Sequence, residues 1–137
     1  MCIGGVAKID PQQEIFTKLK VEIEKSYDTY DGALPPADTP YPFVYLGEVT
    51  LQDDYGNKSM VLANVSVTIH VWSDDFTKRG THSEILRNVK EIARGITNTT
   101  SYSWQVLNIY QRQLEDSTTK TPLLHGVLQI EYKLLGG

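Results

Sequence analysis

The chain has few of the residues that would indicate disulfides, membrane spans or nucleic-acid coating. Cys2 is the only cysteine in 137 residues, so no intramolecular disulfide can form and a reducing compartment is favoured. No run of about 18 apolar residues occurs, and the N-terminus lacks the basic and apolar regions of a signal peptide. The formal net charge of −4 argues against a basic nucleic-acid-binding surface. We therefore expect a soluble protein, made in a cytoplasm, with no membrane contact.

Motifs for catalysis and for cofactor binding are also scarce. Neither glycine-rich phosphate loop, G-x-G-x-x-G or G-x-x-x-x-G-K-[ST], occurs. His70, His82 and His125 each lack a second ligand at metal-binding spacing in the sequence. The acidic pairs at 53–54 and 74–75 lack the alternating spacing of a calcium loop. The sequence therefore predicts no enzyme, no cofactor and no metal site.

The N-terminus leaves one catalytic alternative. If Met1 is removed, Cys2 becomes the first residue, and its α-amino group could serve as base for its own thiol. The start Met-Cys-Ile-Gly-Gly is faintly similar to that of N-terminal-nucleophile amidotransferases, an amidohydrolase class. The glycines are offset from that pattern, and such domains are considerably longer than this chain. An unpaired cysteine in a flexible tail over residues 1–9 is the better interpretation.

Two amphipathic helices are predicted from apolar spacing and capping residues. The first has Asp10 as N-cap, Pro11 at the first helical position and Gln13 completing a capping box, and it ends near Ser26. The second opens with the capping-box pattern of Thr81 and Glu84 and stops at Gly95.

Four long strands complete the prediction. They are expected over Phe43–Leu51, Val61–Trp72, Tyr102–Leu114 and Leu123–Leu135, with a bulge or bend near Gly126 in the last. The second strand alternates strictly between apolar and more polar residues, so one of its faces should pack on the core. Residues 1–137 are thus expected to form one α+β domain, a mainly antiparallel sheet of about four long strands with both helices on one face.

Charge is distributed unevenly along the chain. From Ser26 to Asn57 there are six acidic residues and no lysine or arginine, whereas Lys78 to Arg94 carries five bases against two acids. Two solvated surfaces would account for this pattern. The other interpretation is that neighbouring copies meet head to tail with complementary charge.

Three segments in a fixed order carry a family resemblance. Tyr30–Glu48 reads Y-D-G followed by a proline-rich arm and P-F-V-Y-L-G-E, Val67–Ser73 ends in H-V-W-S, and His125–Ile130 reads H-G-V-L-Q-I. Together with one predicted helix before them and one between the second and third, these segments resemble the tail terminator, or tail completion, proteins of long-tailed bacteriophages. The resemblance covers roughly residues 12–133.

The resemblance implies a structural, non-enzymatic role. Members of this family form a ring, typically a hexamer, on the last ring of the tail tube, where they stop polymerisation and present the head-tail joining surface. The implied partners are further copies of the chain, the tail tube protein and the head-tail connector protein, with DNA only as cargo in the lumen. The expected location is the tail or neck of the virion, after assembly in the host cytoplasm. Another neck or head-tail adaptor of related fold is the alternative.

Candidate interface residues follow from the charge pattern and from two predicted loops, Gln52–Ser59 and Glu115–Thr121, which we expect to contact axial partners. They are Asp38, Asp53, Asp54, Tyr55, Lys58, Arg79, Arg87, Lys90, Arg94, Glu115 and Asp116. The acidic residues could instead line the lumen, where they would repel phosphate and let DNA slide. The sequence leaves both interpretations open.

Overall fold

The structure is a computed structural model that describes residues 10–32, 35, 38–54, 62–75, 77–117 and 122–136. The predicted tail over residues 1–9 lies outside the described residues. The elements are α1 (Pro11–Glu24), β1 (Thr29–Asp31), β2 (Phe43–Asp54), β3 (Leu62–Ser73), α2 (Arg79–Arg94), β4 (Ser103–Asp116) and β5 (Leu123–Gly136). The predicted α+β class is confirmed, with the short β1 as an addition.

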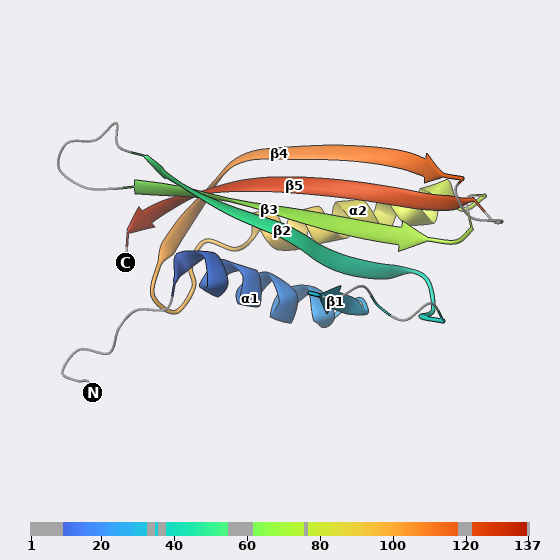
Figure 1. Cartoon of the computed structure of the whole chain (residues 1–137), viewed down its shortest axis with the longest axis horizontal. Helices are drawn as coiled ribbons and strands as arrows, with labels where there is room; N and C mark the ends of the chain where they lie inside the picture. The colour runs from blue at the N-terminus through green and yellow to red at the C-terminus, as the bar shows by residue number, and fades with distance from the viewer. Residues whose placement is uncertain are drawn as a thin grey trace.

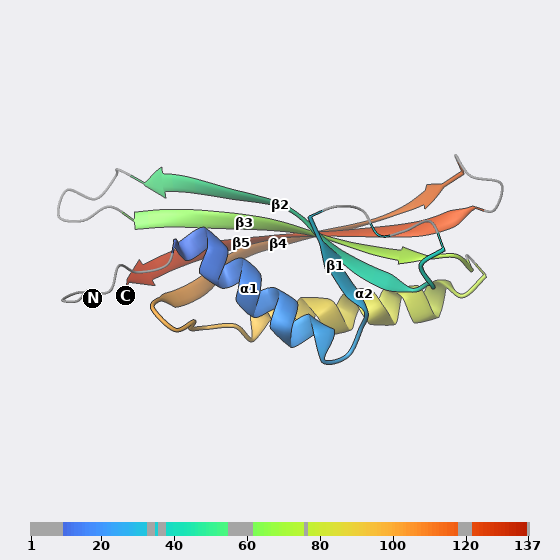
Figure 2. The same cartoon turned by 60° about the horizontal axis from the view of Figure 1, so that its bottom comes forward.

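The five strands form one sheet in the order β1-β2-β3-β5-β4. All neighbouring pairs are antiparallel except β1 and β2, which run parallel. Both helices lie on the same side of this twisted sheet, and β4 forms its far edge (Figures 1 and 2). The predicted placement of two helices on one face is therefore confirmed.

The core lies between the helices and the alternating apolar face of the sheet. In β3, Val65, Val67, Ile69 and Val71 are completely buried, as the strict alternation of this strand predicts. The helices and the other long strands supply the remaining fully buried apolar side chains, including Ile15, Leu19, Ile23, Val44, Leu86, Val89, Ala93, Leu128 and Ile130. The core thus extends along both helices and the three central long strands.

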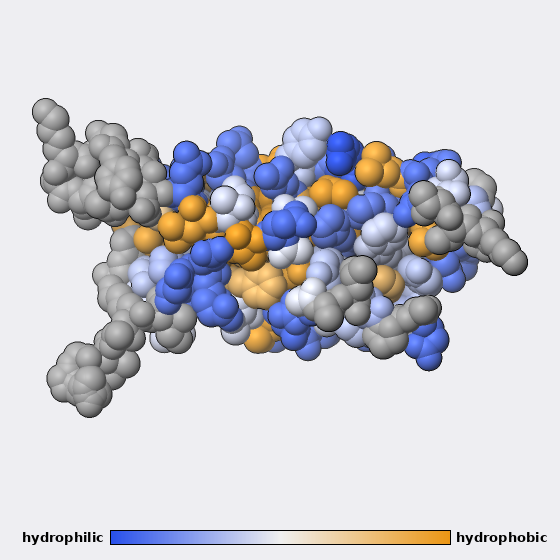
Figure 3. Space-filling view, in the orientation of Figure 1, coloured by the Kyte–Doolittle hydropathy of each residue, from blue (hydrophilic) through white to orange (hydrophobic). Residues whose placement is uncertain are grey.

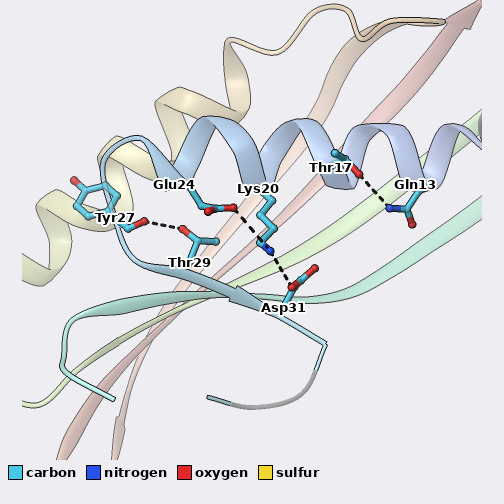
Figure 4. Close-up of polar contacts among 7 residues, drawn as sticks. All are labelled: Gln13, Thr17, Lys20, Glu24, Tyr27, Thr29 and Asp31. Carbon is cyan, nitrogen blue, oxygen red and sulfur yellow. Dashed lines mark hydrogen bonds and ion pairs between the residues drawn. The ribbon is translucent and has the colours of Figure 1, made fainter. Parts of the chain in front are cut away.

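The predicted capping of α1 is confirmed for Asp10 but not for Gln13. Asp10 is the N-cap, but its carboxylate accepts from the N–H of Gln12 rather than from that of Gln13. The amide of Gln13 instead donates to Thr17 Oγ1 at 3.1 Å (Figure 4). The predicted role of Gln13 in a capping box is therefore wrong, because its side chain bonds along the helix.

The end of α1 is fastened to β1 by an ion pair. Lys20 Nζ lies 3.2 Å from Asp31 Oδ1, and Thr29 Oγ1 donates to the carbonyl oxygen of Tyr27 at 2.9 Å (Figure 4). Short as it is, β1 pairs with Val44–Leu46 of β2. These contacts direct the chain from α1 along the outer edge of β2.

The predicted start of α2 at Thr81 is wrong. The helix begins at Arg79 with Lys78 at the N-cap, and no side chain caps it. A turn just before it explains the difference. Asp75 accepts from the N–H of Thr77 through its carboxylate and from the N–H of Lys78 through its carbonyl, which sets the chain into a helical turn two residues early.

Two predicted loops are shorter than expected because the strands continue into them. In β2, the main-chain pairs Asp53 with Ala63 and Asp54 with Leu62 extend the hairpin. In β4, Glu115 and Asp116 pair with Leu124 and Leu123. These four acidic residues were predicted in loops, and that placement is wrong. Polar residues are tolerated here because antiparallel pairing needs only the main chain.

The predicted irregularity near Gly126 is also wrong. The β3–β5 register runs unbroken through Gly126, and Leu124 and Leu128 are both buried on its core side. Register shifts occur instead in β2, between Leu46 and Val49, and in β4, between Val106 and Asn108. Gly126 therefore does not bend the strand, and its missing side chain leaves room for Leu86.

Candidate functional site

The face of the sheet opposite the helices carries no helix in the described part of the chain (Figure 2). We call this surface the open face. Its side chains follow from the strand register and include Tyr45, Thr68, His70, Trp72, Asn108, Tyr110, Arg112, Leu114, His125, Val127 and Gln129. In the view of Figure 3, apolar side chains stand in separate groups between hydrophilic ones rather than in one continuous patch.

Aromatic rings cluster on the open face near the end of β3 and the start of β5. His70 Nδ1 lies 2.8 Å from His125 Nε2, and the two rings are stacked with centroids 5.0 Å apart. Trp72 stacks almost flat on His125, with centroids 3.8 Å apart and an interplanar angle of 8°. Tyr45 packs against His70 from the other side, at 6.0 Å. Antiparallel pairing of Trp72 with His125 creates this cluster from residues far apart in sequence.

Burial lowers the pKa of both imidazoles and so favours their neutral forms. Burial, followed by the charge of the neighbouring His70, lowers the pKa of His125 to about 4, against the opposing effect of Asp116. Burial also lowers the pKa of His70, with Glu48 opposing. In the neutral pair, one ring donates its N–H and the other accepts. A general base works best with a pKa near the operating pH, so this pair fits a structural role better than a catalytic one.

Gly47 belongs to this cluster because His70 covers it. A Cβ at position 47 would lie 2.9 Å from His70 Nε2 and 3.3 Å from the carbonyl oxygen of Thr68. The glycine of the L-G-E motif thus leaves room for the His70 ring. It sits within the register shift of β2, where one strand gains residues relative to its partner.

His82 occupies a separate buried position in α2. It is 1% exposed, and its Nδ1 lies 2.8 Å from Ser73 Oγ. Its Nε2 is buried without a hydrogen-bond partner among the described residues. Burial lowers the pKa of His82, and the Arg79 charge lowers it further. A cavity of about 250 Å³ borders this side chain and reaches Pro42 and Lys78.

The histidines therefore form one pair and one separate residue. Among the described residues, no three His, Cys, Asp or Glu side chains come together as potential metal ligands. Cys2, on which the amidohydrolase alternative depends, lies outside the described residues.

The basic residues of α2 share one flank. Ser83 accepts from the Gln113 amide of β4 at 2.9 Å, and Arg79 pairs with Glu115 of the same strand. On the opposite side, Asn88 donates to Tyr27 at the end of α1. At 100° per residue, the other bases of the helix fall on the side of Ser83. We define the basic flank as Arg79, Arg87, Lys90 and Arg94.

The remaining predicted interface residues are dispersed. Arg94 also bonds Glu91 within the helix at 2.5 Å, and Asp38 is exposed between β1 and β2. Asp53 and Asp54 end β2, and Asp116 ends β4. Tyr55 and Lys58 lie outside the described residues. The structure thus brings Arg79 and Glu115 together within one chain and places the basic flank along β4.

Strand β4 is a long edge that residue patterns did not single out. Its 14 residues pair with β5 on one side, and most of its side chains are exposed. Leu107, Tyr110 and Leu114 are at least 40% exposed. A long edge strand with exposed apolar side chains is a surface on which another strand can pair. The alternation of side chains along the predicted strand could have indicated which of its residues are exposed. It could not have indicated that the strand lies at the edge of the sheet.

These features define the class of protein as a small α+β domain in which, among the described residues, no helix covers one sheet face and no strand pairs with most of the outer edge of β4. No helix in the described part of the chain is long and apolar enough to cross a membrane.

The family model for Tail completion protein gp17 matches residues 23–132. The chain therefore belongs to the tail completion protein family, as its motifs predicted, and is a structural protein of the phage tail. A solved structure described as "Virion of native gene transfer agent (GTA) particle" is similar at 17% identity and a TM-score of 0.60, covering 93% of this chain and 95% of that chain. That likeness shows a common fold. No curated protein matches the chain significantly.

Proposed function

We propose that copies of this chain form a closed ring on the end of the tail tube, which ends tube polymerisation and provides the surface for joining the head. The match to the tail completion family over residues 23–132 carries the proposal. The role is structural, with no turnover of a substrate.

The charge distribution of the subunit supports a ring. In a closed head-to-tail ring each copy uses two different surfaces, and these must complement each other. The basic flank of α2 lies beside β4, at one side of the sheet. Exposed acidic residues belong to or adjoin β1 and β2 at the other side, among them Asp28, Asp38 and Glu48. Such a division favours head-to-tail contact between copies. The hexameric number rests on the family resemblance alone.

Axial partners would meet the ring at the ends of the strands. The residues that join β2 to β3 and β4 to β5 lie mostly outside the described residues, and as sequence-predicted loops they are the best candidates for contact with the tail tube protein and the head-tail connector protein. DNA would pass through the lumen as cargo. Acidic residues that face the lumen would keep phosphate from adhering, which is the alternative use for the acidic stretch.

A different head-tail adaptor is the second candidate. The GTA virion likeness at 17% identity establishes a fold and leaves the position within the particle open. An adaptor would share ring formation but would bind other neck proteins. The two candidates differ in what is left incomplete when the chain is missing, since only a terminator controls tail length.

Ring formation can be tested on the purified full chain. Light scattering over a range of protein concentrations, with electron microscopy of the same samples, should give a single closed oligomer of fixed mass. Adding tails assembled without the chain should shift that equilibrium toward rings bound at tail ends. A chain that stays monomeric at all concentrations and does not bind tail ends contradicts the proposal.

A further inference from the structure

We propose that the free edge of β4 in one copy pairs, antiparallel, with the outer edge of β2 over about Thr50–Asp54 in a second copy. This inference rests on the proposed ring and assigns its interface to particular strands. In this arrangement, neighbouring copies are joined by main-chain hydrogen bonds between strands as well as by charged side chains.

The β4 edge offers the first half of such a junction. The strand is the last in the sheet order, and beyond its start, where Ser103 bridges to Asn98, none of the described residues forms a strand along its outer row of main-chain groups. Tyr110 is 60% exposed on the open face, and Leu114 is 40% exposed on the same face. Natural proteins usually protect such an edge with proline, with inward-pointing charge or with a cover. Between Ser103 and Asp116 there is no proline, and Arg112 is the only basic residue.

The outer edge of β2 offers the second half. There, β1 pairs only with Val44–Leu46. Further along, Gln12 of α1 donates its amide to the carbonyl oxygen of Val49 at 2.8 Å, which shows that this carbonyl points away from β3. Since main-chain direction alternates along a strand, the N–H and carbonyl of Leu51 and Asp53 point the same way. Among the described residues, no strand pairs with this end of β2 on its outer side.

The strand directions match for two copies that are related by rotation about a ring axis. Within one chain, β2, β3, β5 and β4 alternate in direction, so β4 is antiparallel to β2. Copies related by a ring axis keep the same orientation with respect to that axis. A β4 edge that meets the next β2 edge therefore continues the antiparallel alternation of the sheet.

Charge favours a second copy as the occupant. The basic flank lies along the β4 side, and the exposed acidic residues adjoin the β1–β2 side, so joining the two edges places opposite charges next to each other. Pairing β4 with β4 of another copy would instead bring two basic flanks together. A single chain thus carries both complementary edges.

Cysteine cross-linking of assembled particles tests the junction. In a Cys2→Ser background, Gln52→Cys is combined in turn with Asn108→Cys, Tyr110→Cys or Arg112→Cys, which are exposed residues on the open face. At least one pair should give, on oxidation, a ladder of covalent oligomers that ends at the ring mass, because disulfides need Cα atoms within about 7 Å. The control pairs Gln52→Cys with Val21→Cys, which is 50% exposed on α1, and should remain monomeric.

A proline substitution tests the same edge independently. The N–H of Trp104 donates to the carbonyl of Thr97 and so points away from β5, and Gln111 shares the sheet face of Trp104. Its N–H should therefore also point outward. Gln111→Pro should leave the monomer folded, by circular dichroism, and lower ring formation at least tenfold.

The outcomes separate the junction from the ring. If rings form normally, none of the three pairs cross-links and Gln111→Pro forms rings as well as the parent, the strand junction is overturned. The proposed ring itself is then unaffected. A chain that is missing from tail ends in purified particles overturns both. A cross-link ladder together with loss of rings in Gln111→Pro supports the junction.

Discussion

Leu86 of α2 lies directly over Gly126 of β5, so close that a Cβ at position 126 would stand 2.6 Å from Leu86 Cδ2. Leu86 is completely buried, and Gly126 faces the core within an unbroken strand pair. The missing side chain lets the helix approach the sheet closely. The glycine of the H-G-V-L-Q-I motif thus sets the spacing between the two layers.

Substitution of this glycine should therefore destabilise the fold. Gly126→Ala forces Leu86 from its position, and overpacking of a core typically costs about 1–3 kcal/mol. The free energy of unfolding in urea measures the loss. Gly80→Ala is the matched control, since no atom lies within 4 Å of its Cβ position and alanine favours a helix over glycine by about 1 kcal/mol. Equal stability of Gly126→Ala and the parent would contradict the packing account.

Gly47→Ala should disturb the aromatic cluster more than the core. Its Cβ would displace the His70 ring, which lies at 2.9 Å, and so break the contact between His70 and His125. We expect shifted imidazole resonances for both histidines in NMR spectra, with a smaller loss of stability than for Gly126→Ala because a partly exposed ring can move. Unchanged resonances in a folded Gly47→Ala variant would show that the ring does not depend on this glycine.

Stability should rise with pH between about 4 and 6.5. The pKa of His125 is about 4 in the folded chain against an ordinary value of 6.5, so the unfolded chain binds more protons in this window. The stabilisation is fully present above pH 6.5 and is lost as the pH falls toward 4. A 2.5-unit difference would correspond to about 3.4 kcal/mol, and because solvent screens this half-buried side chain we expect about 1–2 kcal/mol. His125→Gln should flatten the profile, as measured by urea unfolding at each pH; an unchanged slope would contradict the assignment.

The contact between Ser73 and His82 can be tested by a double-mutant cycle. Ser73→Ala leaves His82 Nδ1 buried without its partner, which should cost about 1–3 kcal/mol. Adding His82→Leu removes the buried polar group as well, so the double variant should regain part of that loss. If the two effects simply add, the pair does not interact in solution.

Charge reversal on the basic flank should weaken assembly without unfolding the chain. Arg87 is exposed, so Arg87→Glu should change the free energy of unfolding by less than about 0.5 kcal/mol. It should lower ring formation at low salt, and the difference should shrink as salt increases. Lys18→Glu, at an exposed residue of α1 outside the basic flank, serves as the control. Equal ring formation by all three proteins would exclude a role for the basic flank.

The strands with regular alternation could be predicted from the sequence, whereas features that depend on distant partners could not. β3 was predicted well because every second residue is apolar and buried. β1 was missed because three residues carry no period, and their strand conformation depends on pairing with Val44–Leu46. The start of α2 was missed because the turn at Asp75 competes with the capping pattern at Thr81.

The candidate surfaces also differ in whether local sequence patterns could have predicted them. The basic flank could have been predicted from helical spacing, since Arg79, Arg87, Lys90 and Arg94 fall within one side of a helix. The pairing of His70 with His125 could not, because it depends on the register between β3 and β5. The edge position of β4 depends on the complete strand order, which local patterns do not contain.

Tail length in particles assembled without this chain tests the central claim most directly. Electron micrographs of lysates that lack the chain should show tails of variable, excessive length that are not attached to filled heads. Supplying the chain from a second copy of its gene should restore a single tail length and joined heads. Tails of normal, uniform length in the absence of the chain would contradict its role as the tail terminator.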